Sequence, residues 1–311
     1  MTSITKKIKI SGVGIHSGKT VNMIIKPSKK TGIFFQRTDV KHSKLIPATF
    51  DNVGETLMRN TTIGNTSGAH VQTIEHLMAA LFMLRIDCAI IEIDGNETPI
   101  LDGSAYEFIK VLEKVVDKKT PIKKIFVKKT IIAHRNELVR FMPFWKKIKT
   151  IILNHTIWRH GNGYVKLSPN KSGLSIDATL VYKDKIIGTQ SYSCEIDETK
   201  KSFNDFVKNV SKARTFGKYS EWEYLKSHGM GRGANENNVI ALNADGDGTL
   251  NKLYYHDEFV RHKIIDAIGD MFTSGGFIYG HLESYKGSHA LNNLVLRKLF
   301  SDKSNYEIVE A

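Results

Sequence analysis

Residues 257–270 read DEFVRHKIIDAIGD, a stretch in which apolar and ionisable side chains are interleaved. The apolar spacing predicts a buried helix within residues 256–272. His262 and Asp266 are four residues apart and therefore share one face of that helix, and Asp270 lies one turn further along. The apolar positions are Phe259, Ile264, Ile265 and Ile268.

The face shared by His262 and Asp266 has two interpretations. One is a His–Asp pair on an exposed helix surface. The other is a metal site, because a neutral imidazole and a carboxylate at this spacing can both bind one Zn²⁺ at about 2.0–2.2 Å. The apolar residues around the pair predict burial, and buried charges need a partner or a metal. Both interpretations stay open on these residues alone.

Residues 71–81, VQTIEHLMAAL, predict a second helix, within residues 72–84. Neighbouring helix positions point about 100° apart. A metal bound by His76 would therefore have Glu75 beside it, where a carboxylate could take a proton from water bound to the metal. A capping glutamate next to a packed histidine is the alternative.

His289 lies in KGSHALNN, residues 286–293, near the predicted start of a third helix. An imidazole there could donate a proton to a leaving group, with its pKa set by an acid such as Asp270. The alternative is a surface histidine that caps the helix.

The remaining sequence predicts strands and helices in an order that occurs twice. In the first half we expect a hairpin at 7–26, strands near 32–35 and 45–50, a helix at 72–84, a strand at 88–93 and a helix at 105–116. In the second half we expect strands at 124–132 and 173–182, a helix from 203, a helix at 256–272, a strand at 276–284 and a helix at 288–300. This order predicts an α+β protein.

Charge is unevenly distributed in this chain of 311 residues. It carries 45 Lys and Arg against 32 Asp and Glu, a formal net charge of +13. Residues 121–160 hold ten Lys and Arg and one acid, Glu137, a local charge of +9. A uniformly basic nucleic-acid-binding surface is therefore a poor description of the protein. The basic stretch indicates either a solvated junction and loop or a segment attracted to an anionic membrane surface or ligand.

The sequence also indicates a compartment. No apolar segment typical of a secretion signal follows the N-terminus, and the longest apolar run, residues 77–84, is too short for a bilayer, which needs about 20 residues. Two cysteines, Cys88 and Cys194, are too few for a disulfide framework and suit a reducing compartment. We expect a soluble, cytoplasmic protein.

Six segments together resemble one family, the zinc-dependent UDP-3-O-acyl-N-acetylglucosamine deacetylases of lipid A biosynthesis. They occur in order and extend from about residue 6 to residue 300. The segments are GVGIHSG (12–18), TIEHLMAAL (73–81), PILDGSA (99–105), ARTFG (213–217), DEFVRHKIIDAIGD (257–270) and GSHALNN (287–293).

The resemblance implies two structurally similar layered domains, residues 1–121 and 122–311. Each would be a β-sheet packed against helices, with the active site between them. It also implies that His76, His262 and Asp266 bind a catalytic Zn²⁺, with water as the fourth ligand. Two histidines and one aspartate suit Fe²⁺ as well, so the metal used in the cell stays open.

The same resemblance implies roles for four catalytic residues. Glu75 would take a proton from the attacking water. Thr215, together with zinc, would stabilise the oxyanion. His289, oriented by Asp270, would stabilise that charge or protonate the departing amine.

The activity implied is removal of the N-acetyl group of UDP-3-O-(3-hydroxyacyl)-N-acetylglucosamine, which gives the free amine and acetate. Lys263 would contact the charged part of the nucleotide sugar, and Phe216 would line the substrate site. The family's insert for the acyl chain is expected within about residues 161–195. We expect a monomer with no nucleic-acid partner and at most peripheral membrane contact.

The sequence departs from the family between residues 137 and 160, where about 20 basic, aromatic and apolar residues are inserted. Surface loops tolerate insertion because the entropy of loop closure grows slowly with length. We therefore expect a protruding segment without a catalytic role.

Two other functions compete with the deacetylase. One is a lipid or nucleotide-sugar binding protein that keeps the fold without catalysis. A protein that only binds would not need all five of the candidate residues present here. They are Glu75, His76, His262, Asp266 and His289. The other is a nucleic-acid-binding protein, which rests only on the net charge and would show salt-sensitive affinity independent of His76.

Overall fold

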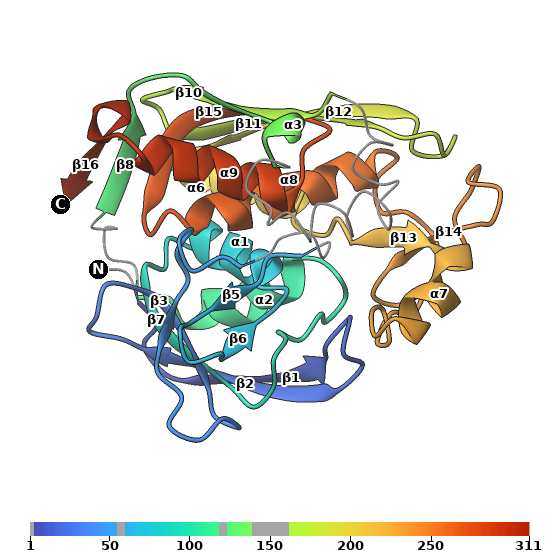
Figure 1. Cartoon of the computed structure of the whole chain (residues 1–311), viewed down its shortest axis with the longest axis horizontal. Coiled ribbons are helices and arrows are strands. Elements are labelled where there is room, and N and C mark those ends of the chain that lie inside the picture. Colours follow the sequence, from blue (N-terminus) through green and yellow to red (C-terminus); the bar gives the residue numbers. More distant parts are fainter. Residues whose placement is uncertain (1–2, 55–59, 118–122, 139–161, 311) are drawn as a thin grey trace.

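The computed structural model describes residues 3–54, 60–117, 123–138 and 162–310. In these ranges two large β-sheets lie on the outside and helices lie between them (Figure 1). The predicted α+β class is confirmed. The inner helices are α1 (Glu75–Met83), α2 (Tyr106–Leu112), α8 (Glu258–Phe272) and α9 (His289–Phe300).

The first large sheet has the strand order β1-β2-β7-β3-β4. Burial alternates along β2, where Val21, Met23 and Ile25 are buried and their neighbours are more exposed. This period of two is expected of a sheet that packs one face against helices. Its strands are β1 (Ile8–Val13), β2 (Thr20–Pro27), β3 (Gly32–Arg37), β4 (Ile46–Pro47) and β7 (Cys88–Ile93).

The second large sheet has the order β12-β11-β15-β10-β9, with β8 paired to β15 and β16 paired to β8. In each large sheet the strand after the central helix, β7 after α1 and β15 after α8, pairs in parallel with an earlier strand. The strands are β8 (Lys123–Val127), β9 (Ile131–His134), β10 (Tyr164–Pro169), β11 (Leu174–Val181), β12 (Thr189–Ile196), β15 (Phe277–Tyr285) and β16 (Tyr306–Glu310).

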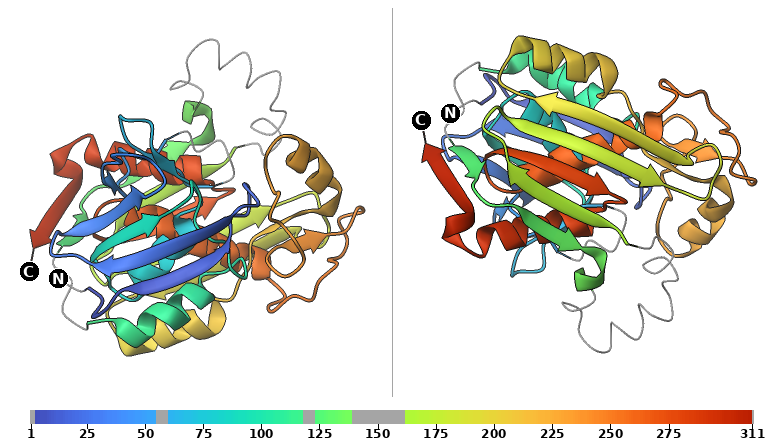
Figure 2. Two further views of the ribbon diagram at one scale, coloured as in Figure 1. Left: turned by 90° about the horizontal axis from the view of Figure 1, so that it is seen from below. Right: turned by 90° about the horizontal axis from the view of Figure 1, so that it is seen from above.

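Smaller elements lie around these layers. Helix α6 lies beside α2 at one edge, and β13, α7 and β14 lie to one side of the layers (Figures 1 and 2). None of the described helices is long and apolar enough to cross a bilayer. The smaller elements are β5 (Ile63–Gly64), β6 (His70–Val71), α3 (Arg135–Leu138), α6 (Lys200–Asn209), β13 (Phe216–Lys218), α7 (Trp222–Ser227), β14 (Ile240–Leu242) and the 3-10 helices η1 (Glu113–Val115), η3 (Tyr219–Glu221) and η4 (Lys303–Asn305).

The main predicted helices are confirmed, and two predicted strands are wrong in extent. Residues 124–132 form two strands, β8 and β9, because the amides of Lys128 and Lys129 both donate to the carbonyl of Asn305 between them. The strand expected at 45–50 is only β4, since the chain turns away and the Phe50 amide donates to the Thr273 carbonyl.

The predicted place of the insert for an acyl chain is also wrong. Residues 161–195 hold β10, β11 and most of β12, which are strands of the second large sheet. Among the described residues, it is residues 216–242, with β13, α7 and β14, that lie to one side of the layers (Figure 1). Within the insertion expected at 137–160, residues 139–160 lie outside the described ranges. The division of the chain at residue 121 stays a prediction.

Helices α1 and α8 pack directly against each other in the middle of the molecule (Figure 1). Every residue of α1 is buried, as are thirteen of the fifteen residues of α8. The contact is close at Gly269, where a Cβ would lie 2.0 Å from the Glu75 carbonyl oxygen. Glycine at this position therefore lets α8 approach the first turn of α1, which carries Glu75 and His76.

Replacement of Gly269 by Ala is expected to lower the free energy of unfolding by about 1–3 kcal/mol, because the added methyl must push two packed helices apart. Chemical denaturation monitored by circular dichroism measures this. Gly54→Ala is the matched control, since its Cβ would meet no atom of the described residues closer than 3.8 Å. Equal stability of the two variants would contradict the tight α1–α8 contact.

Candidate active site

Three side chains from α1 and α8 meet where these helices cross. His76 projects from the first turn of α1, and His262 and Asp266 project from one face of α8. Asp266 Oδ1 lies 3.6 Å from His76 Nε2 and 3.4 Å from His262 Nε2. All three side chains are buried. The structure thus brings together the three residues predicted as metal ligands, and these three side chains are called the cluster below.

This arrangement fits a tetrahedral metal ion. Two donors that are each about 2.0–2.1 Å from a tetrahedral ion lie roughly 3.3 Å apart, close to the separations between Asp266 and the two histidines. Among the described residues, the buried Oδ1 of Asp266 has no hydrogen-bond partner. A buried carboxylate oxygen is costly without a partner, and a cation between the three donors would supply one.

The second nitrogen of His262 is held by the backbone. His262 Nδ1 lies 3.1 Å from the Ala213 carbonyl, which can only accept, so Nδ1 carries the proton and Nε2 faces the cluster. The neighbouring Arg214 is fixed by Glu258, whose Oε1 accepts from its backbone N at 3.0 Å and its Nε at 2.9 Å. This buried ion pair holds the segment that orients His262.

Electrostatics favour the protonation states that a metal requires. Burial lowers the pKa of His262 to about 3, so its imidazole is neutral at physiological pH. Burial opposes ionisation of Asp266, but the positive charges of Lys263 and His289 outweigh it and hold the pKa of Asp266 well below its usual value. Neutral imidazole and ionised carboxylate are the forms that bind metal ions.

Glu75 lies next to the cluster and precedes His76 in α1. Its Oε2 accepts a hydrogen bond of 3.0 Å from the backbone N of Thr61. Carboxylate oxygens of Glu75 and Asp266 and a ring nitrogen of His289 all lie within 4.8 Å of one another. Burial raises the pKa of Glu75, although His289 and His76 act in the opposite direction. A raised carboxyl pKa suits a group that must accept a proton near neutral pH.

His289 is the first residue of α9 and faces the same space. Its Nδ1 lies 2.8 Å from Asp270 Oδ2, and its Nε2 lies 3.8 Å from Asp266 Oδ2. Burial opposes its protonation, but Asp270 and Asp266 outweigh burial and raise the pKa of His289 to about 9. The imidazole is therefore a cation at neutral pH and can donate a proton from Nε2.

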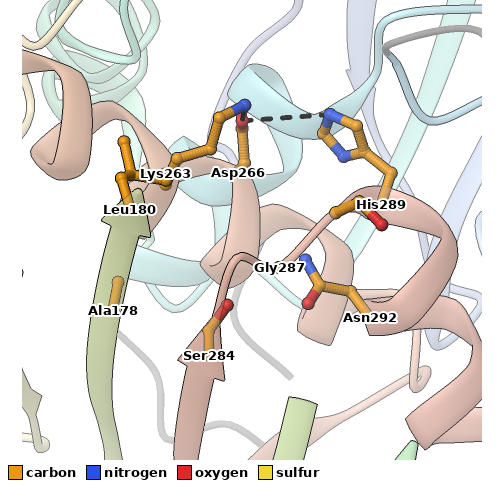
Figure 3. Close-up of a pocket in the computed structure, with 9 residues that line it drawn as sticks. Ala178, Leu180, Lys263, Asp266, Ser284, Gly287, His289 and Asn292 are labelled. Carbon is orange, nitrogen blue, oxygen red and sulfur yellow. Dashed lines mark hydrogen bonds and ion pairs between the residues drawn. The ribbon is translucent and has the colours of Figure 1, made fainter. Parts of the chain in front are cut away.

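A small pocket opens beside these groups (Figure 3). The close-up shows Lys263, Asp266 and His289 along one side and Ala178 and Leu180, from β11, on another. Lys263 Nζ donates to Asp266 Oδ2 at 2.6 Å, which leaves Asp266 Oδ1 for the cluster. The pocket thus combines ionisable groups with an apolar wall, as ligand-binding pockets commonly do.

The structure places Phe216 beside His262 and Lys263 and fixes Thr215 through its backbone. The ring of Phe216 lies 6.2 Å from that of His262, and Lys263 Nζ lies 5.5 Å from the Phe216 ring centroid. Thr215 is fixed by its backbone, which bonds to Gly103 and Ile240. Within the described ranges, no hydrogen bond joins its hydroxyl to the cluster, so a role for this hydroxyl stays a prediction.

Two residues that bind the carboxylate of Asp270 were not predicted from the sequence. Thr61 donates to Asp270 Oδ1, and Asn292 Nδ2 donates to Asp270 Oδ2 at 2.8 Å. Asn292 lies within a segment that the sequence analysis singled out, three residues after His289. Thr61 lies in an irregular segment about 200 residues from Asp270, and no local pattern predicts that contact.

Two imidazoles and a carboxylate that fit a metal, beside a separate buried carboxylate and a cationic histidine, define the class of site found in metal-dependent hydrolases. Comparison with known protein families points to the same class. Residues 1–301 match the family model described as LpxC, UDP-3-O-acyl N-acetylglycosamine deacetylase.

A curated relative supports the same family. The UDP-3-O-acyl-N-acetylglucosamine deacetylase of Shewanella pealeana (strain ATCC 700345 / ANG-SQ1) is 35% identical over 308 residues, which cover 99% of this chain and 92% of the relative. The chain therefore belongs to the UDP-3-O-acyl N-acetylglycosamine deacetylase family, a family of metalloenzymes, and the resemblance found in the sequence is confirmed.

Proposed function

We propose that this protein is a zinc-dependent UDP-3-O-acyl-N-acetylglucosamine deacetylase of lipid A biosynthesis. It hydrolyses the N-acetyl group of UDP-3-O-(3-hydroxyacyl)-N-acetylglucosamine to give UDP-3-O-(3-hydroxyacyl)-glucosamine and acetate. The observation that carries the proposal is the cluster of His76, His262 and Asp266 with Glu75 and His289 beside it, in a chain of this family.

His76, His262 and Asp266 would hold the zinc ion. Two imidazole nitrogens and one carboxylate oxygen form a common ligand set for catalytic zinc, which keeps one position open. When bound, zinc supplies two effects, a lowered pKa of water and polarisation of the acetamide carbonyl. The remaining steps belong to the side chains of this protein.

Glu75 acts as the general base. It accepts one proton of the water whose oxygen attacks the acetamide carbon, and the C–N bond of the resulting tetrahedral species then breaks. Thr61 fixes one carboxylate oxygen of Glu75 by a hydrogen bond of 3.0 Å, which limits rotation of the carboxylate. Positioned acid–base groups contribute about 10²–10⁴-fold to a reaction rate.

His289 acts as the general acid. Its Nε2 proton passes to the sugar nitrogen as the C–N bond breaks, so that the amine leaves as a neutral group. Asp270 accepts from Nδ1 and keeps the imidazole oriented during this transfer. Before transfer, the cationic ring also stabilises the negative charge on the former carbonyl oxygen, and Thr215 is a further donor for that charge.

Lys263 and Phe216 are the proposed substrate-binding residues. The ammonium group of Lys263 borders the pocket and suits a negatively charged nucleotide sugar. Phe216 supplies an apolar surface next to His262. The partner of this protein is thus a nucleotide-sugar lipid. A cytoplasmic location, a monomeric state and at most peripheral membrane contact remain predictions.

Acetate release from two substrates tests this function. The purified protein is expected to release acetate from UDP-3-O-(3-hydroxyacyl)-N-acetylglucosamine much faster than from UDP-N-acetylglucosamine, which lacks the acyl chain. Binding of the acylated substrate without acetate release would instead support a non-catalytic binding protein. A salt-sensitive affinity for DNA that survives replacement of His76 would favour the nucleic-acid hypothesis.

A further inference from the structure

Thr61 is buried between the two halves of the site and contacts both. It lies before β5, and its partners are Glu75 in α1, Asp270 in α8 and His289 in α9. Of these, Glu75 is the proposed general base, His289 is the proposed general acid, and Asp270 orients His289. Thr61 therefore joins groups that are distant in the sequence.

The hydroxyl of Thr61 contacts the proposed acid. Thr61 Oγ1 donates to Asp270 Oδ1 at 2.5 Å, so its single proton is used there. The same oxygen lies 3.2 Å from His289 Nδ1. A hydroxyl oxygen that donates its proton elsewhere still has lone pairs, so Thr61 can accept from Nδ1 together with Asp270 Oδ2. This holds the Nδ1 proton of His289 in place and orients Nε2, with its own proton, toward the site.

The backbone of Thr61 contacts the proposed base. Its N–H donates to Glu75 Oε2 at 3.0 Å, and its carbonyl accepts from the amide of Ile74, the residue before α1. The peptide groups of Thr61 thus fix the start of α1 together with the Glu75 carboxylate. Because hydroxyl and amide belong to one residue, Thr61 links the position of the base to that of the acid.

We propose that Thr61 is a positioning residue of this enzyme, which holds the Glu75 carboxylate and the Asp270–His289 pair in one fixed arrangement. The proposal rests on the proposed deacetylase function. Thr61 acts through these groups and performs no proton transfer itself. Its loss should therefore reduce the turnover number while metal content and substrate affinity stay almost unchanged.

The structure offers well-matched variants for the test. Thr61→Val keeps the shape and the backbone N–H but removes the hydroxyl. Thr61→Ser keeps the hydroxyl and removes a methyl group. Thr62→Val is the control, because the hydroxyl of Thr62 donates to Asn60 at 3.1 Å and is outside the site.

Steady-state kinetics with the acylated substrate give the first result. Thr61→Val is expected to lower kcat about 10–100-fold, a part of the roughly 10²–10⁴-fold that a positioned acid contributes, with KM changed less than about 2-fold and metal per chain unchanged. Thr61→Ser should recover most of the kcat, and Thr62→Val should match the wild type. A kcat for Thr61→Val within about 2-fold of the wild type would overturn the proposal.

A double-mutant cycle with Asp270→Ala separates positioning from general structural support. If Thr61 acts through Asp270, Thr61→Val should have little effect on kcat in the Asp270→Ala background. The same fold-loss in both backgrounds would overturn the proposal. If Thr61→Val fails to fold, Thr61→Ala, which also lacks the hydroxyl, serves in its place, and it must then show the same dependence on Asp270.

An NMR measurement tests the positioning role of Thr61 independently of the deacetylase activity. The Nδ1 proton of His289 should give a downfield ¹H NMR signal, which Thr61→Val shifts and Thr62→Val leaves in place. If the wild type releases no acetate, the proposed function fails, yet this signal still reports whether Thr61 orients His289. An unshifted signal in Thr61→Val would overturn the positioning role.

Discussion

Replacement of Glu75 by Gln is expected to lower kcat about 10²–10⁴-fold, the contribution of a positioned general base. The amide has nearly the shape of the carboxylate, and its oxygen can still accept from the Thr61 amide. It cannot, however, accept a proton from water at neutral pH. Because Glu75 is outside the proposed ligand set, the variant should keep its metal. Acetate release and metal analysis of one preparation measure both effects.

Two results for Glu75→Gln would contradict the assignment. Loss of the metal would indicate that Glu75 is a ligand, and an almost unchanged kcat would indicate another base. Glu92→Gln is the control, since Glu92 pairs with Lys26 on the first sheet. That variant should behave as the wild type.

Replacement of His262 by Ala is expected to abolish both metal binding and acetate release. The change removes one of three protein ligands, so metal affinity should fall by more than the roughly 100-fold caused by loss of an outer-shell partner. The neighbouring Asp266 would then lose the cation that its unpartnered Oδ1 needs. Equilibrium dialysis against zinc measures the affinity.

His281→Ala is the matched control for the His262 variant. His281 is also a histidine of the second half, but it lies on β15 with its Nδ1 2.9 Å from the hydroxyl of Ser175. It should keep the affinity and activity of the wild type. If His262→Ala bound zinc as tightly as His281→Ala, the proposed ligand set would be wrong.

The helices that carry the site could be predicted because their local signals are strong. In α8, His262 and Asp266 share a face at i and i+4 among apolar residues, and burial of that face made a metal site plausible. In α1, the apolar positions gave the helix, and adjacency placed Glu75 beside His76. The contact between the two helices could not be derived from periodicity, because Gly269 forms it by long-range packing.

Other features depend on contacts between distant residues. The break between β8 and β9 is stabilised by the carbonyl of Asn305, far along the chain. Thr61 meets Asp270 across 209 residues from a segment without regular structure. The wrong place of the insert has a similar cause, since β10 and β11 join their sheet by pairing with β15, and β12 pairs with β11.

Titration of zinc into the demetallated protein tests the central claim most directly. Acetate release should be negligible without metal, rise in proportion to added zinc and reach its maximum at one zinc per chain. His262→Ala should show no such rise over the same range. Acetate release that is independent of zinc, or a maximum that needs two or more zinc ions per chain, would contradict a single catalytic metal held by His76, His262 and Asp266.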